Sequence, residues 1–318
     1  MLLLILSAGC GEQKSKRLIL AHGLDTQHSV HQAMEFMSDR LLELSGGKLG
    51  LTIYPNQQLG SERQCIELLQ IGSVDMTKVS TAVMEGFVPL FRVLSIPYIF
   101  RDRDHAFNVL DGPLGEQLLE LGTSFRLRGL CFYDSGSRSF YTKTSPVVKP
   151  EDLKGLKIRV MSSATSMDMV KALGGAATPI SWGELYTALQ GGVVDGAENN
   201  PPSFYLSRHY EVCRYYSINE HSTIPDLVLI STHAWNRLSG HERTWLREAA
   251  DESVVYQRDL WLKSEQEALK SLKEAGVEIV YPDKEPFVRL LEPLRESYKT
   301  NPEIKKWIEE IEKAGETG

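Results

Sequence analysis

The sequence predicts an α/β protein with two lobes that share one long helix. Three observations favour this fold class: strand-like and helix-like segments alternate from residue 17 onward, a second such run begins near residue 130, and residues 239–275 carry one uninterrupted helical pattern. The 318 residues are sufficient for two domains, each with its own core.

The first run of segments has the order β-α-β-α-β. Short apolar stretches predict its strands at residues 18–21, 49–54 and 74–79. Residues 31–44 carry methionine and leucine at helical spacing, and Ser61 can cap a second helix that ends near residue 71 at Gly72. This order requires a parallel or mixed sheet with helices on both faces.

The second run predicts another α/β lobe. A helical turn is expected at 149–155 and a helix at 166–173. Ser181 and Glu184 have the spacing of a capping box, which predicts a helix through residue 189. Four apolar stretches predict strands: residues 130–133, 156–161, 193–194 and 227–231.

Residues 239–275 predict a single helix, because no proline and no glycine follows Gly240 and apolar residues recur at spacings of three, four and seven. Such a helix would be some 50 Å long, at about 1.5 Å per residue, which is too long for one small lobe. A coiled-coil strand is the alternative, although polar Gln257 and Ser264 interrupt its seam. We therefore expect a helix that bridges both lobes.

Composition excludes several functional classes. The net charge is −7 and the pI is near 5.7, with no basic stripe, so we expect no binding to nucleic acid. After the first ten residues, no apolar run approaches the roughly 20 residues that cross a bilayer.

The N-terminus resembles the end of a bacterial lipoprotein signal peptide. Residues 1–6 are almost wholly apolar, and small residues lead to Cys10, which would be acylated. No Lys or Arg precedes the apolar run and Ser7 replaces the usual aliphatic residue, so a chance apolar N-terminus is the alternative. The favoured interpretation makes residues 1–16 a signal and tether and predicts an exported protein that associates with the membrane only through this lipid.

Catalytic and metal-binding signatures are not found. The sequence has no GxSxG, HExxH, P-loop or GxGxxG motif, and the His28–His31 pair lacks an obvious third ligand. Cys65, Cys131 and Cys213 have no metal-ligand spacing, so buried free thiols are expected, with one disulfide pair as the alternative. We therefore expect no cofactor, no metal and no enzymatic activity, and an enzyme on a similar scaffold is the competing hypothesis.

Arg159 is the first candidate for a ligand contact. It lies in the apolar stretch 156–161, a strand expected to be covered by helices on both faces, so its guanidinium would be buried. A buried guanidinium requires an anion, and its paired N–H groups match a carboxylate. Two interpretations follow: an internal ion pair with Asp or Glu, or an acidic ligand.

Three further candidates stand next to predicted elements. Arg138 lies at a turn just after a strand, where α/β sheets place ligands. Asn199 also follows a strand and precedes a double proline. Trp182 opens the capped helix, where it could stack on a sugar ring or pack in the core.

With these residues, the chain resembles the solute-binding proteins of tripartite ATP-independent periplasmic (TRAP) transporters, in the dicarboxylate-binding-protein (DctP) family. The resemblance covers nearly everything after residue 17, and the order and spacing of its motifs are specific. Five segments carry it: 54–60 (YPNQQLG), 96–98 (IPY), 152–159 (DLKGLKIR), 184–190 (ELYTALQ) and 195–199 (DGAEN).

The resemblance implies a periplasmic receptor with a ligand cleft between its lobes, crossing hinge strands and a lobe-spanning helix. Lobe I would comprise 17–135 plus 225–264, and lobe II 136–224 plus 265–318. The lobes would close around the ligand by hinge motion and present it to two membrane subunits. In this family the arginine of the LKxR strand binds the ligand carboxylate, which assigns that role to Arg159. The resemblance gives Arg138 a second carboxylate contact, Asn199 a polar contact and Trp182 an aromatic wall.

The resemblance also suggests the ligand. His28, Glu62 and Lys78 fall in first-lobe segments that line the family's cleft, and so many polar groups suggest a polyhydroxylated acid. Several segments look similar to members that take hexuronates such as glucuronate or galacturonate. A C4-dicarboxylate or a 2-keto acid is the main alternative, and delivery to a sensor protein is a second.

Overall fold

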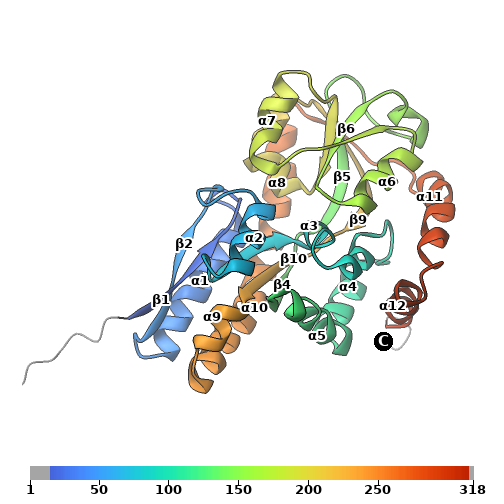
Figure 1. Ribbon diagram of the computed structural model, residues 1–318. Coiled ribbons are helices and arrows are strands. Elements are labelled where there is room, and N and C mark those ends of the chain that lie inside the picture. The colour runs from blue at the N-terminus through green and yellow to red at the C-terminus, as the bar shows by residue number, and fades with distance from the viewer. Residues whose placement is uncertain (1–14, 315–318) are drawn as a thin grey trace, which may run out of the picture.

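The computed structural model of the protein describes residues 15–314 and contains two sheets, each at the centre of a lobe (Figure 1). The sheet of the first lobe contains, in spatial order, β2 (Leu49–Tyr54), β1 (Lys16–Ala21), β3 (Met76–Ser80), β10 (Asp226–Ser231) and β4 (Leu127–Tyr133). The sheet of the second lobe contains β11 (Glu278–Val280), β9 (Tyr215–Thr223), β5 (Ser137–Thr142), β8 (Gly196–Asn199), β6 (Lys157–Val160) and β7 (Ala176–Pro179). The predicted two-lobed α/β class is confirmed.

The start of the first lobe follows the predicted β-α-β-α-β order. Strand β1 pairs in parallel with β2 and β3, and β10 is antiparallel to both β3 and β4. The capping box at Ser61 forms with Gln64, and Gly72 ends that helix in the left-handed conformation (φ 76°). The helices of this lobe are α1 (Ser29–Leu44), α2 (Glu62–Ile71), α3 (Thr81–Met84), η1 (Pro89–Ser95), α4 (Arg103–Leu110), α5 (Pro113–Glu120), η2 (Thr123–Phe125) and α9 (Thr232–Arg237).

Several predictions for the second lobe are wrong. Residues 130–133 and 227–231 form β4 and β10, which belong to the sheet of the first lobe, and Arg138 lies on β5 instead of at a turn. Residues 193–194 follow a glycine turn, and the strand begins only at Gly196, so Asn199 ends a strand instead of following one. The Ser181 hydroxyl donates to the Glu184 carboxylate and caps no backbone N–H, so the capping box does not form. The helices here are η3 (Pro150–Leu153), α6 (Ala164–Ala172), α7 (Trp182–Gln190), α8 (Pro201–Leu206), η4 (His209–Glu211), α11 (Glu285–Tyr298) and α12 (Pro302–Lys313), of which α12 packs on η1 of the first lobe.

Helix α10 (Gly240–Glu274) confirms the predicted bridge between the lobes (Figure 1). Ser239 and Glu242 form its capping box. The helix packs on α1 and β4 of the first lobe and on α8 of the second. Its Leu246 lies in a core cluster of the first lobe and its Leu272 in a core cluster of the second. Within residues 15–314, no helix is both long enough and apolar enough to cross a membrane.

Two short segments also cross between the lobes: residues 134–136 join β4 to β5, and Ile224 with Pro225 joins β9 to β10. The first crossing is crowded. Gly136 has a φ of +58°, and a Cβ on it would lie 3.0 Å from Trp261 Nε1 on α10. The crossing therefore needs glycine both for its backbone conformation and for the close approach of α10.

We predict that Gly136→Ala destabilises the protein more than Gly155→Ala. Both glycines have positive φ, so both variants bear the left-handed penalty of about 1 to 2 kcal/mol. The alanine methyl group at position 136 would also have to displace the indole of Trp261, whereas nothing lies within 4 Å of a Cβ at position 155. Urea unfolding of both variants measures the difference, and equal midpoints would show that α10 does not constrain the crossing.

Candidate functional site

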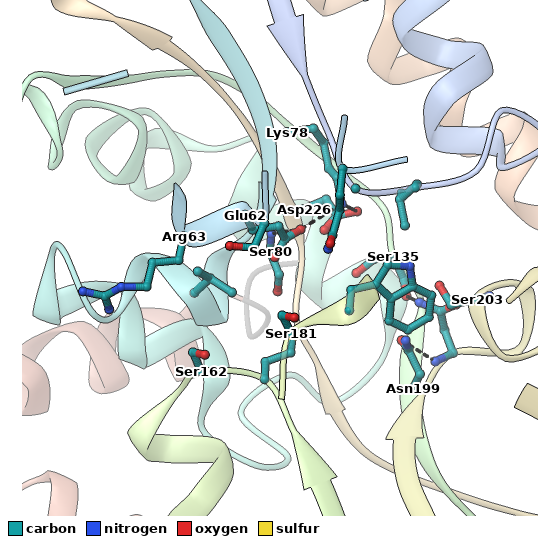
Figure 2. Close-up of a pocket in the computed structure, with 18 of the residues that line it drawn as sticks. Glu62, Arg63, Lys78, Ser80, Ser135, Ser162, Ser181, Asn199, Ser203 and Asp226 are labelled. Carbon is teal, nitrogen blue, oxygen red and sulfur yellow. Dashed lines mark hydrogen bonds and ion pairs between the residues drawn. The ribbon is translucent and has the colours of Figure 1, made fainter. Parts of the chain in front are cut away.

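A cavity of about 310 Å³ lies between the two lobes, near the lower end of the size range of small-molecule sites (Figure 2). In Figure 2, Glu62, Ser80 and Lys78 of the first lobe face Ser181 and Asn199 of the second. All seven residues that the sequence singles out for ligand binding line this cavity: His28, Glu62, Lys78, Arg138, Arg159, Trp182 and Asn199.

Arg159 contributes an unpaired guanidinium to the wall. The residue lies on β6 and is 2% exposed. Its Nε donates to the Ile180 carbonyl at 2.8 Å, whereas Nη1 is buried without a partner and no carboxylate within residues 15–314 forms an ion pair with it. Burial lowers the pKa of this guanidinium. The internal ion pair that the sequence left open is therefore not found in the described part of the chain.

Arg138 on β5 is already occupied by protein groups. Its Nε and Nη2 hold the two carboxylate oxygens of Glu198 at 2.5 and 3.0 Å, and Nη2 also donates to the Glu198 carbonyl at 2.9 Å. Nη1 donates to Asn199 Oδ1 at 2.8 Å. Of its five N–H groups, one on Nη1 has no acceptor among the residues that the structure describes. Arg138 can therefore donate one hydrogen bond to a ligand, which is fewer than the two of a bidentate contact with a carboxylate.

Glu198 fixes the orientation of this arginine. Burial alone would raise the pKa of its carboxyl, but Arg138, together with His221 at 3.5 Å, outweighs burial and holds the pKa at about 2. The carboxylate is therefore charged at any pH at which the protein works. The Arg138–Glu198 pair is neutral overall, which leaves Arg159 as the buried cation of the second lobe's wall that has no protein anion among the described residues. The other charged residue that lines the cavity from this lobe, Glu184, is exposed.

Asn199 and Trp182 complete this wall. Asn199 Oδ1 accepts hydrogen bonds from Arg138 and from the backbone N–H of Asn200, at 2.8 and 2.9 Å, so its amide NH₂ remains as a donor. Trp182 is half-buried at the start of α7, and its ring lies 6.0 Å from the Arg159 guanidinium carbon. Its other neighbour is the His209 ring, at 5.1 Å between centroids. The indole forms an aromatic surface beside the unpaired guanidinium.

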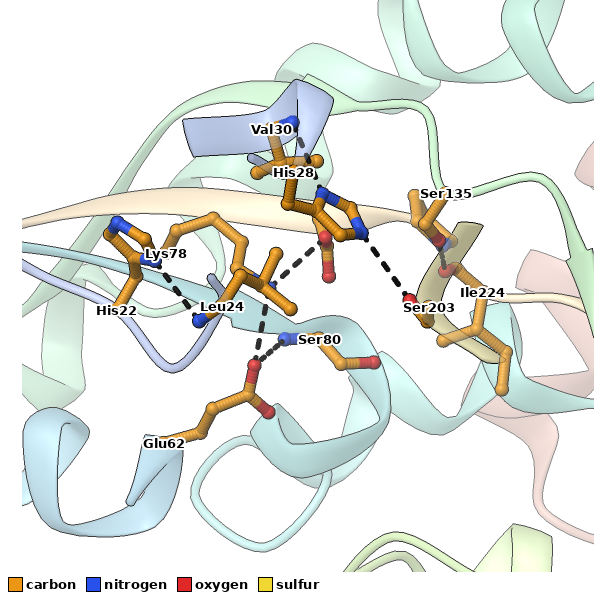
Figure 3. Close-up of polar contacts among 12 residues, drawn as sticks. His22, Leu24, His28, Val30, Glu62, Lys78, Ser80, Ser135, Ser203 and Ile224 are labelled. Atoms are coloured by element: carbon orange, nitrogen blue, oxygen red, sulfur yellow. Dashed lines mark hydrogen bonds and ion pairs between the residues drawn. The ribbon is translucent and has the colours of Figure 1, made fainter. Parts of the chain in front are cut away.

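His28 supplies a neutral donor from the first lobe. It is the N-cap of α1, and its Nδ1 accepts from the Val30 N–H at 3.2 Å, so the proton of the neutral ring lies on Nε2 (Figure 3). Nε2 lies 3.4 Å from Ser203 Oγ of the second lobe. Burial, with a contribution from Lys78, lowers the pKa of His28 to about 3. His31 hydrogen-bonds instead to His22, and no cluster within residues 15–314 could hold a metal ion.

Lys78 on β3 lies between two carboxylates. Its Nζ is 3.3 Å from Glu62 Oε1 and 3.1 Å from Asp226 Oδ2 (Figures 2 and 3). Burial opposes the ammonium charge, but the two carboxylates outweigh burial and raise the pKa of Lys78. Sequence reasoning missed Asp226, because the strand pattern around it identifies only its apolar neighbours.

Sequence reasoning also missed Gln57 and Trp261. Gln57 lies in the YPNQQLG segment, and Trp261 belongs to the apolar pattern that predicts α10, so neither residue stands out as a ligand contact. Each lines the cavity and has a buried side-chain nitrogen without a partner among the described residues. These two nitrogens and Arg159 Nη1 are the buried polar side-chain atoms of the described cavity wall that have no partner, and all three are hydrogen-bond donors. The cavity therefore suits a ligand rich in acceptors, such as a carboxylate that also carries hydroxyl oxygens.

Comparisons with known proteins agree with this chemistry. Residues 20–301 match the family described as bacterial extracellular solute-binding protein, family 7. A TRAP periplasmic solute-binding protein from Bradyrhizobium sp. BTAi1, in complex with α/β-D-galacturonate, is 39% identical with a TM-score of 0.92 and covers 94% of this chain and 100% of its own. One from Chromohalobacter salexigens, with bound D-glucuronate, is 33% identical with a TM-score of 0.91 over 93% and 99%. The C4-dicarboxylate-binding periplasmic protein of Rhodobacter capsulatus is 33% identical over 73% of this chain and 70% of its own.

We predict a pH-dependent difference between wild type and His28→Asn. Asparagine keeps an acceptor for the Val30 N–H, so the cap of α1 is retained. In the unfolded chain, His28 gains a proton below about pH 6.5, whereas in the folded chain it stays neutral down to about pH 3. Wild type therefore loses stability relative to the variant on acidification, by about 1.4 kcal/mol per pH unit below pH 6.5.

Denaturant unfolding between pH 7 and 4.5 measures this difference. The variant that removes the exposed His241, His241→Asn, is the control for loss of an imidazole outside the cavity. Parallel stability profiles for wild type and His28→Asn would mean that His28 titrates in the folded protein as it does in the unfolded chain.

Proposed function

The chain belongs to family 7 of the bacterial extracellular solute-binding proteins, the receptors of TRAP transporters, and we propose that its solute is a hexuronate such as galacturonate or glucuronate. The observation that carries this proposal is the buried Arg159 guanidinium, which has no protein anion among the described residues and faces a cavity of the right size. A carboxylate supplies the missing charge, and its two oxygens match the guanidinium fork.

The remaining groups suit the sugar. The flat face of Trp182 packs on the pyranose ring, and the Asn199 amide and the last Arg138 N–H donate to oxygens near the carboxylate. His28, Glu62 and Lys78 contact hydroxyl groups from the first lobe. Because both lobes contribute, the ligand stabilises the closed arrangement, and this closed form is delivered to the membrane subunits.

A contact between the two lobes supports the closure step. Glu85, at the end of α3 in the first lobe, accepts from Ser163 Oγ at 2.6 Å and from Thr165 Oγ1 at 2.9 Å, at the start of α6 in the second lobe. His28 and Ser203 approach each other across the cavity as well. These interlobe contacts fit a closed receptor.

The proposed lobe boundaries are 17–135 plus 225–264 for lobe I and 136–224 plus 265–318 for lobe II. The two sheets and the crossings at 134–136 and 224–225 support this division. Helix α12 falls in lobe II by sequence position, although it packs on η1 of the first lobe.

We also propose that the receptor is held at the membrane by a lipid on Cys10, a residue outside those that the structure describes. A bacterial lipoprotein carries more than one acyl chain, and two chains give stable anchoring. The wild-type protein should fractionate with membranes, and Cys10→Ser should appear in the soluble fraction or remain unprocessed. A mature N-terminus downstream of an unmodified Cys10, measured by mass spectrometry, would contradict this proposal.

We predict that Arg159→Ala abolishes measurable hexuronate binding while the fold is retained. Leaving a ligand carboxylate without its buried partner costs about 3 to 5 kcal/mol, or roughly two to four decades in Kd. Arg214→Ala, the same substitution at an exposed site of the second lobe, is the matched control. Calorimetry that gave Arg159→Ala an affinity within threefold of wild type would make Arg159 a structural residue.

We predict that galacturonate or glucuronate raises the Tm of the protein and that neutral hexoses do not. A ligand at a thousand times its Kd stabilises the folded state by about 4 kcal/mol, which is several degrees in Tm. Neutral hexoses lack the group that Arg159 requires. A shift with succinate or a 2-keto acid, and none with any sugar acid, would overturn the hexuronate assignment and leave the receptor role intact.

A further inference from the structure

The buried part of the first-lobe wall contains one more carboxylate than ammonium group. Lys78, Glu62 and Asp226 form one cluster there, in which a single ammonium serves two carboxylates. Lys78 is almost wholly buried, with 3% of its side chain exposed, and the carboxylates are 18% and 10% exposed. Burial raises the pKa of Glu62, and Lys78 opposes this shift. With all three groups ionised, the cluster has a net charge of −1. The other cation at this wall, Arg63, lies at the rim, where it pairs with Glu67 and is largely exposed.

Each carboxylate keeps one oxygen for a ligand. Glu62 Oε1 accepts from Lys78 and from the Ser80 N–H, at 3.3 and 3.2 Å (Figure 3). Asp226 Oδ2 accepts from Lys78 at 3.1 Å (Figure 2). Within residues 15–314, no protein group donates to Glu62 Oε2 or Asp226 Oδ1, and neither oxygen is sealed from the cavity. These two oxygens are acceptors, so they bind hydroxyl groups and repel a second carboxylate.

The buried part of the opposite wall has the reverse polarity, because the one other carboxylate that lines it among the described residues, on Glu184, is exposed. Arg159 is an unpaired cation, whereas the charge of Arg138 is cancelled by Glu198. A ligand must therefore place a carboxylate at the second lobe and hydroxyl groups at the first. A solute with carboxylates at both ends satisfies Arg159 and then brings its second anion against Glu62 and Asp226.

We propose that Glu62 and Asp226 are specificity-determining residues that exclude dicarboxylates and accept polyhydroxylated monocarboxylates. This inference rests on the proposed hexuronate function and adds the reason why a dianion is rejected: Lys78, the cation that could have bound it, is already neutralised. Discrimination then comes from a built-in repulsive element as well as from favourable contacts. Removing both carboxylates leaves Lys78 as an uncompensated buried cation and converts the wall into a second carboxylate site.

The test compares galacturonate with galactarate, which carries a carboxylate at each end, by calorimetry on four proteins: wild type, Glu62→Gln, Asp226→Asn and the double variant. The amides preserve side-chain size and remove one negative charge each. Glu248→Gln, on the exposed part of α10, is the charge-matched control. Circular dichroism checks the fold, and the two single variants act on different elements, so at least one independent measurement is retained if one variant misfolds.

We expect wild type and the control to prefer galacturonate by at least a hundredfold. Each single variant should reduce this ratio at least tenfold, and the double variant should bind galactarate at least as tightly as galacturonate. Unchanged ratios in folded variants, or equal wild-type affinity for both acids, would overturn the inference while hexuronate binding stands. Failure of wild type to bind any hexuronate would overturn the proposed function and this inference with it.

Discussion

Arg159 is buried in the wall of the cavity with only its Nε bonded to the described protein, and the rest of the site is arranged around this unmet requirement. Removal of a guanidinium from water is costly unless an anion compensates for it. The nearby carboxylate of Glu198 pairs instead with Arg138, which lies two strands away from Arg159 in the same sheet. Arg138 is thereby fixed by a protein carboxylate, and Arg159 remains without a protein anion among the described residues, as the proposed carboxylate contact requires.

The architecture explains how this charge is used. Arg159 and Asn199 lie on the neighbouring strands β6 and β8 of the second lobe, and the Lys78 cluster lies on the sheet and α2 of the first. A solute that satisfies both walls connects the lobes, so binding and closure are one event. Helix α10 contacts both lobes and brings Trp261 to the cavity, against the crossing at Gly136. The cavity, the crossing at residues 134–136 and helix α10 therefore meet at Trp261.

The sequence predicts correctly those helix limits that depend on residues close together in the chain. The extent of α10 follows from the absence of breakers and from the apolar spacing over residues 239–275, and the end of α2 follows from Gly72. The errors come from tertiary context. Ser181 bonds to a carboxylate instead of the backbone, and β8 forms where a partner strand is available, after the apolar dipeptide. Strands β4 and β10 pair in the sheet of the first lobe although they lie in the second run of segments. Arg159 was identifiable because an arginine inside an apolar strand is itself a signal. Asp226 and the occupation of Arg138 by Glu198 depend on residues far apart in sequence, which no local pattern reveals.

In the proposed complex, the ligand carboxylate lies on Arg159 and the ligand hydroxyl groups face the Lys78 cluster. A crystal structure of the protein with galacturonate tests this most directly. The account predicts both carboxylate oxygens within hydrogen-bond distance of Arg159 Nη1 and Nη2, the ring against Trp182, and hydroxyl groups on Glu62 and Asp226. A carboxylate bound to Lys78, or a sugar whose carboxylate makes no contact with Arg159, would contradict it.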